Sequence, residues 1–125
     1  MPRLFRVILP VANIDQAAAF YGQLLDLPGK RVSPGRHYFD CEGVILACFD
    51  PRADGDDFDA VPNPDHVYFA VNDLDAVFER AKGSGFTALD PSIKTRLWGE
   101  RSFYGKDPFG NPICFVDERT LFTGQ

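Results

Sequence analysis

The sequence of 125 residues lacks the features that would place it in a membrane or on nucleic acid. No apolar run approaches the roughly 20 residues that a membrane-spanning helix needs. The N-terminal region has neither the long apolar core nor the small-residue cleavage site of a signal peptide. An excess of basic residues is also missing: the formal net charge is −5, which disfavours binding to a phosphate backbone. We therefore expect neither a nucleic-acid nor a membrane partner.

Cysteine is scarce, and its pattern is not that of a disulfide scaffold or a zinc site. The three residues, Cys41, Cys48 and Cys114, are odd in number and form no C-x-x-C pair. Such spacing is typical of reduced thiols in a cytoplasmic protein. The chain also has no G-x-S-x-G motif and no glycine-rich phosphate loop. We expect a cytoplasmic protein without a nucleophile elbow or a nucleotide site.

The negative charge is concentrated in one segment. Residues 50–65 contain six aspartates and one arginine, which together equal the whole net charge of the chain. Such a run is usually a solvated connector that favours solubility. Within this segment, residues 54–59 resemble a calcium-binding loop only loosely, because Phe58 occupies a ligand position and no glutamate closes the pattern.

The first half of the chain follows the pattern of one strand, one helix and three strands. Residues 4–9 form an apolar run, interrupted by Arg6 and containing the β-branched Val7 and Ile8, which predicts a strand. Apolar residues then recur at helical spacing behind Asn13, a favourable N-cap, and Pro28-Gly29 ends this helix. The turn residues that follow predict three short strands, near 30–34, 36–40 and 44–49.

The second half repeats this pattern with an offset of about 60 residues. A strand at 66–71 precedes a helix that Asp73 caps and that Gly83-Ser84-Gly85 ends. Further strands are predicted near 86–90, 100–106 and 112–117. The sequence thus predicts an α+β fold in a single domain, 1–125. It is divided into a first βαβββ module at 1–49, an acidic linker at 50–65 and a second βαβββ module at 66–119.

Three phrases of the chain resemble a known family. They are Val11-x-Asn13-Ile14-x₅-Phe20-Tyr21, His66-Val67-x₃-Val71-x-Asp73-Leu74, and Trp98-Gly99-Glu100-Arg101-Ser102-Phe103-Tyr104-Gly105-Lys106-Asp107-Pro108-x-Gly110-Asn111. They are similar to the vicinal oxygen chelate superfamily, which includes glyoxalase I, bleomycin-resistance proteins, extradiol dioxygenases and fosfomycin-modifying enzymes. The resemblance covers nearly the whole chain. It implies paired βαβββ modules whose curled mixed sheets enclose a cavity, usually in a homodimer.

The resemblance also implies where a metal would bind. Enzymes of this superfamily hold a divalent ion with His or Gln from the first strand of each module and Glu from the last strands. The corresponding positions here are Arg6, Ala47, His66 and Cys114. Arginine and alanine do not ligate metals. We expect no metal cofactor; if one is bound, His66 and Cys114 would hold it.

Strand alternation predicts which side chains would line the cavity instead. The resemblance supplies the inward parity, and it places Trp98 on the loop where bleomycin-resistance proteins carry the same Trp-Gly pair. The expected ligand-binding residues are Arg6, His37, Phe39, His66, Tyr68, Trp98, Ser102, Tyr104 and Cys114. Such a mixture of aromatic walls and few polar groups is typical of a small-molecule pocket.

The leading hypothesis is a metal-independent binding protein that holds a flat or anionic small molecule, in the manner of the bleomycin-resistance proteins. Arg6 would anchor charge, and Trp98, Tyr104 and Phe39 would stack on the ligand. The alternative is a divalent-metal-dependent lyase, transferase or dioxygenase with an altered ligand set drawn from His66, Cys114 and His37. Two further readings are a metal-free enzyme that uses His66 or Tyr104 as an acid–base group, and a protein whose filled cavity leaves only an interaction surface.

Overall fold

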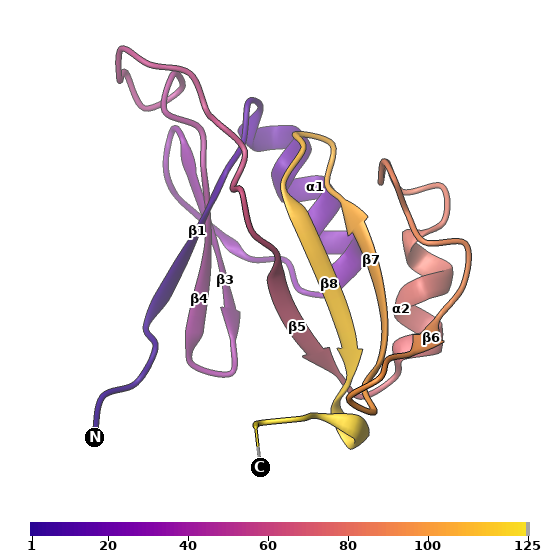
Figure 1. Ribbon diagram of the computed structural model, residues 1–125. Coiled ribbons are helices and arrows are strands. Elements are labelled where there is room, and N and C mark those ends of the chain that lie inside the picture. The colour runs from indigo at the N-terminus through magenta and orange to yellow at the C-terminus, as the bar shows by residue number, and fades with distance from the viewer. Residues whose placement is uncertain (125) are drawn as a thin grey trace. The chain divides into compact units, whose positions relative to one another are not determined.

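The chain forms two α+β modules of the same βαβββ type. The computed structural model describes residues 1–124. Two compact units divide the chain, one covering Met1–Asn63 and the other beginning at Pro64. Each unit holds one four-stranded mixed sheet with one α-helix (Figure 1). The acidic segment thus lies mostly within the first unit.

The first module places its N-terminal strand beside its last one. Its elements are β1 (Arg6–Pro10), α1 (Ile14–Leu25), β2 (Lys30–Ser33), β3 (Arg36–Cys41) and β4 (Val44–Phe49). The strand order is β1-β4-β3-β2, with β1 parallel to β4 and the other pairs antiparallel. The expected N-cap is confirmed, because Asn13 accepts a hydrogen bond from the backbone N–H of Gln16. The helix ends earlier than expected, at Leu25, because Asp26 adopts a left-handed conformation.

The second module repeats this topology. Its elements are β5 (Val67–Val71), α2 (Leu74–Ala81), β6 (Lys94–Thr95), β7 (Arg101–Lys106), β8 (Pro112–Asp117) and the short 3₁₀ helix η1 (Glu118–Thr120). The order β5-β8-β7-β6 again has one parallel pair, β5 with β8. Asp73 caps α2 as predicted by accepting from the N–H of Ala76. The Phe78 ring of α2 packs edge-on against Phe103 of β7, which fixes the helix on one face of the sheet.

The predicted strand at 86–90 is wrong as a continuous element. Thr87 forms only an isolated bridge with Lys106, and the edge strand proper is β6, at Lys94–Thr95. Ala88 has a φ of 50°, outside the extended region, so the backbone cannot continue as a strand through it. The edge of this sheet is therefore interrupted between Thr87 and β6.

The second sheet has one face covered by α2 and one open face. The ladder pairs Tyr68 with Cys114 and Cys114 with Tyr104, so these three side chains share a face. Phe69, Phe103 and Phe115 alternate with them and stack on the covered face. This alternation agrees with the parity predicted for the second module.

The first sheet departs from the predicted parity at β3. His37 and Phe39 were expected on the open face, but both are buried under α1, where Phe39 meets the Tyr21 ring. The His37 ring contacts Phe39, and its Nε2 lies 3.0 Å from the Pro28 carbonyl oxygen. The open face carries Tyr38 instead, whose ring lies under the Arg6 guanidinium.

A difference in hairpin length explains this error. Tyr38 pairs with Ala47, nine residues later, whereas Tyr104 pairs with Cys114, ten residues later. The prediction transferred the spacing of the second hairpin to the first. Because side chains alternate with a period of two, a shift of one residue moves a whole strand's side chains to the other face.

Two aspartates of the acidic segment are anchors rather than solvated charges. Asp50 is buried and accepts hydrogen bonds from the backbone N–H groups of Ile14 and Ala53. Asp54 accepts from Ser33 Oγ and the N–H of Gly35, and the Ser33 hydrogen bond is the main cause that lowers its pKa. The solvated-connector prediction is therefore wrong for these two residues, because the β2–β3 turn and the α1 N-terminus use their carboxylates as acceptors.

The C-terminal segment is tied to the second sheet through Asp117. Its carboxylate is 1% exposed and accepts from the side chain and backbone of Arg119 and from Arg101. The Arg119 contacts, followed by that of Arg101, hold the pKa of Asp117 well below its usual range. Thr120 Oγ1 adds a second tie, because it accepts from the N–H of Arg101 and donates to the carbonyl of Asp117.

Candidate functional site

The open face of the second sheet gathers the polar and aromatic side chains expected there. The His66 ring lies edge-on to Tyr104, with 4.9 Å between the ring centroids, and 6.1 Å from Tyr68. The Tyr68 and Tyr104 rings meet at 6.3 Å. Cys114 lies between these tyrosines on the central strand and is fully buried.

Two of these groups hold their protons more tightly than usual. Burial raises the pKa of the Cys114 thiol to about 11, and the charge of Glu100 acts in the same direction. Burial, followed by a hydrogen bond with Tyr68, raises the pKa of Tyr104 to about 12. At neutral pH both groups stay protonated, which is the opposite of the activation that a cysteine nucleophile or a tyrosine base requires.

Arg96 is a member of this face that the sequence analysis missed. It follows β6, and its guanidinium lies 4.6 Å from the centroid of the Tyr104 ring. Its Nε donates to Ser102 Oγ at 2.8 Å, and its terminal nitrogen donates to Asp90 at 3.0 Å. Arg96 therefore covers the predicted ligand residue Ser102, which is 1% exposed. No hydrophobic periodicity marks this irregular segment, so the sequence offers no signal for it.

A pocket of about 440 Å³ opens beside this cluster, entirely within the second unit. Its wall is formed by β5, β8, the loop before β7 and the C-terminal segment. The lining residues are Tyr68, Phe69, Ala70, Trp98, Glu100, Val116, Leu121 and Phe122. This volume and lining are typical of sites for small organic molecules.

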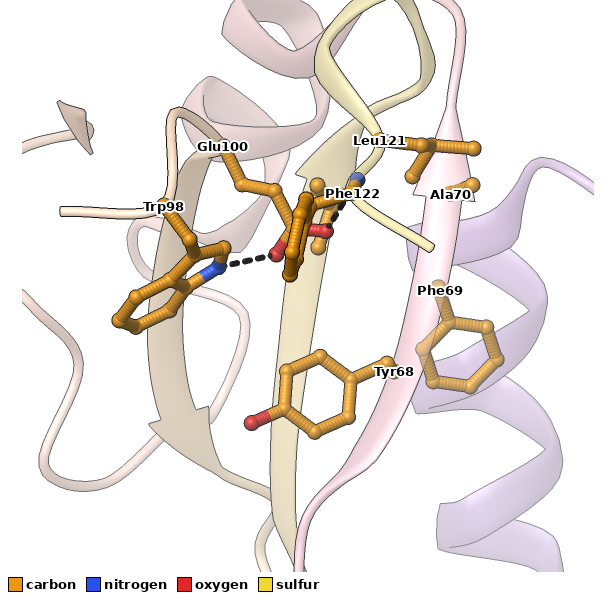
Figure 2. Close-up of a pocket in the computed structure, with 8 residues that line it drawn as sticks. Tyr68, Phe69, Ala70, Trp98, Glu100, Leu121 and Phe122 are labelled. Carbon is orange, nitrogen blue, oxygen red and sulfur yellow. Dashed lines mark hydrogen bonds between the residues drawn. The ribbon is translucent and has the colours of Figure 1, made fainter. Parts of the chain in front are cut away.

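Glu100 holds the two sides of the pocket in place (Figure 2). One carboxylate oxygen accepts from the Trp98 indole N–H at 2.7 Å, and the other accepts from the backbone N–H of Phe122 at 2.9 Å. Trp98 reaches this position from a tight turn, in which Arg96 N–H bonds the Glu100 carbonyl. Gly99 has a φ of 95° in that turn, a conformation that only glycine adopts without strain.

Large apolar side chains remain partly open to solvent at this pocket. Trp98 is 47% exposed, Tyr68 57%, and Leu121 and Phe122 50% each. Trp98 and Tyr68 were predicted as ligand-binding residues. Leu121 and Phe122 were not, because they follow the last strand without any periodic pattern. The hydrogen bonds of Asp117 and Thr120 hold the segment that carries Leu121 and Phe122 beside the second sheet.

Arg6 lies in the other unit, on the open face of the first sheet. Its guanidinium is placed over the rings of Phe5 and Tyr38, at 4.8 and 5.4 Å from their centroids. The side chain is exposed, so it keeps its hydration and needs no buried counter-ion. The surroundings of Arg6 in the first unit therefore do not require an anionic partner.

The side chains at the superfamily's metal positions do not form a fitting donor set. Arg6 and Ala47 share the open face of the first sheet, and neither is a ligand. On the second sheet, His66 and Cys114 are two donors, fewer than the three or four protein ligands that a zinc site usually has. His37, the third member of the alternative set, is held under α1. Within residues 1–124, no group of three His, Cys, Asp or Glu side chains could hold a metal ion.

A match over most of the sequence shows the family of this chain. The pattern of the Glyoxalase/Bleomycin resistance protein/Dioxygenase superfamily matches residues 3–115, and the chain belongs to this superfamily. A search of the curated proteins gave no match. Over residues 1–124, no helix combines the length and apolar character needed to cross a membrane.

Solved structures of the same fold are similar to this chain at low sequence identity. One is a glyoxalase/bleomycin resistance protein from Albidiferax ferrireducens T118, with 21% identity, a TM-score of 0.76, and coverage of 91% of this chain and 98% of that one. Another is a lactoylglutathione lyase from Agrobacterium tumefaciens, with 21% identity, a TM-score of 0.71 and 92% coverage of both chains. A third is TioX from Micromonospora sp. ML1, with 17% identity, a TM-score of 0.68, and coverage of 94% and 99%. At these identities the likeness establishes the glyoxalase fold alone.

Proposed function

We propose that the protein binds a flat aromatic small molecule in the pocket of its second module and releases it unchanged. The observation that carries this proposal is the arrangement of the Trp98 ring. Glu100 fixes it by a hydrogen bond, yet 47% of the residue stays exposed beside Tyr68 and Phe122. A rigid aromatic ring that is oriented but uncovered offers a stacking surface at little cost in conformational entropy.

Binding is favoured over turnover by the chemistry of the neighbouring groups. The raised pKa values of Tyr104 and Cys114 leave both protonated at neutral pH. Arg96 is already engaged with Asp90 and Ser102, so it is not free to polarise a substrate carbonyl. These features support a receptor-like site, as the resemblance to bleomycin-resistance proteins implies.

Acridine, a flat tricyclic compound, serves as the probe. Isothermal titration calorimetry on the full chain should detect saturable binding. Stacking on one aromatic side chain contributes about 1–3 kcal/mol. Trp98→Ala should therefore raise the Kd roughly 5- to 150-fold.

Leu97→Ala is the matched control for this variant. Leu97 precedes Trp98 in the same loop, is 104% exposed and does not line the pocket. We expect its Kd to stay within about twofold of the unmodified protein, because an exposed side chain without contacts contributes little. Equal losses in both variants, or unchanged affinity in Trp98→Ala, would reject the proposed site.

A further inference from the structure

The electrostatic character of the pocket defines the ligand further. Glu100 is the single charged residue among the eight that line it. Both of its oxygens are held, by the Trp98 indole N–H and the Phe122 N–H, so the carboxylate cannot swing away into solvent. Each carboxylate oxygen has a further lone pair after these two bonds, so both can still accept from a ligand.

The cations nearest in the chain are committed elsewhere. Arg96 is 17% exposed, pairs with Asp90 and lies on the Tyr104 ring, outside the pocket lining. Arg101 alternates to the covered face of the sheet, where it pairs with Asp117. Neither arginine forms a salt bridge with Glu100 in the described residues 1–124, because each is paired with an aspartate instead.

The aromatic side chains that line the pocket attract cations, as the Glu100 carboxylate does. Faces of Trp and Tyr rings carry partial negative charge and attract cations, by about 0.5–1 kcal/mol at exposed sites and more where water is displaced. Trp98, Tyr68 and Phe122 surround Glu100 in this pocket (Figure 2). A flat ligand that carries a delocalised positive charge would satisfy both the rings and the carboxylate.

We propose that the pocket selects flat aromatic cations over neutral and anionic molecules of the same shape. This inference rests on the proposed function, because it assigns a charge to the ligand of the same site. It departs from the anionic part of the expectation of a flat or anionic ligand, for which Arg6 was the expected charge anchor. His37 lies under α1 and Arg6 is exposed on the first sheet.

A matched series of acridines tests the charge preference. At neutral pH, 9-aminoacridine is a cation, acridine is neutral, and acridine-9-carboxylate carries an anionic group on the same tricyclic ring. With the full chain at low salt, we expect 9-aminoacridine to bind at least about tenfold more tightly than acridine, and the carboxylate to bind weakest of the three. Raising the salt concentration to about 0.5 M should narrow the difference, because exposed charges are screened.

Two variants separate charge from shape. Glu100→Gln should lower the ratio of cation to neutral affinity to about threefold or less, while acridine itself still binds. Glu118→Gln removes the same charge from an exposed position that does not line the pocket, and should leave the ratio unchanged. If Glu100→Gln weakens acridine as much as 9-aminoacridine, the carboxylate acts only by holding Trp98 and Phe122, and the charge inference is overturned.

The two proposals fail in different ways. Equal affinity of the unmodified protein for all three acridines, lost in Trp98→Ala, would overturn the charge preference and leave the aromatic site standing. If acridine-9-carboxylate bound more tightly than the other two acridines, the charge preference would also be overturned and the aromatic site would stand. Absence of binding by every member of the series would overturn both proposals.

Discussion

Replacing Gly35 by alanine should loosen the acidic segment from the first sheet without changing any charge. Gly35 lies in the turn between β2 and β3. A Cβ atom there would lie 2.2 Å from the Asp50 carbonyl oxygen and 2.8 Å from the Asp54 backbone nitrogen. Ordinary contact begins near 3.4 Å, and both neighbours are backbone atoms, so the segment must retreat by about 1 Å.

The cost of this movement follows from the contacts that it breaks. The Asp50 N–H donates to the Gly35 carbonyl at 2.7 Å, and a retreat of about 1 Å takes this bond beyond hydrogen-bonding distance. That loss costs about 1 kcal/mol, and overpacking adds about 1–3 kcal/mol. We expect a total loss of about 2–4 kcal/mol in the free energy of unfolding, with a fall in Tm of roughly 10 °C for a chain of this size.

Urea and thermal unfolding followed by far-ultraviolet circular dichroism would measure this effect. Gly22→Ala is the control, because Gly22 lies inside α1, where alanine favours the helix by up to about 1 kcal/mol. Its added Cβ would lie 3.2 Å from the Leu27 carbonyl oxygen, a tight contact that offsets part of this gain. A Gly35→Ala variant within about 0.5 kcal/mol of the unmodified protein would refute the docking of the acidic segment.

Three further predictions follow from the buried polar groups. His37→Ala should cost about 1–3 kcal/mol of stability and leave acridine affinity unchanged, whereas Tyr38→Ala on the open face should cost less in the same urea assay. Because the pKa of Asp117 is lowered on folding, its stabilisation is complete above pH 4 and is lost as the pH falls below it; denaturation midpoints from pH 7 to pH 2 should therefore fall less steeply in Asp117→Asn. A thiol reagent at pH 8 should modify the partly exposed Cys41 before the buried Cys114, and equal rates at both would contradict the burial of Cys114.

Local signals in the sequence predicted the repeat and most of its elements correctly. Asn13 caps α1 in the first module and Asp73 caps α2 in the second, and both residues are side-chain acceptors that favour a helix start. Tyr104 and Cys114 do lie on one face, as expected from the inward parity that the resemblance supplied together with the alternation of side chains along a strand. Such features depend on neighbours close in the sequence.

The errors arose where a distant contact decides the structure. His37 was assigned to the wrong face because one residue fewer in the first hairpin reverses the alternation. Asp50 and Asp54 were interpreted as solvated because a run of aspartates does not reveal which carboxylates meet backbone donors 19 to 36 residues away. Phe122 was missed because the contacts that bring this end of the chain to the pocket join residues distant in sequence, such as the hydrogen bond from the Phe122 N–H to Glu100.

The resonance of the Trp98 indole N–H tests the central claim most directly. The chain has a single tryptophan, so a nitrogen-15 correlation spectrum contains one indole signal, and this N–H donates to Glu100 at the rim of the pocket. We predict that titration with acridine shifts this signal progressively to saturation, because a stacked ring imposes a ring-current shift on it. Binding that leaves the Trp98 signal in place, while backbone signals elsewhere in the chain move, would contradict the account.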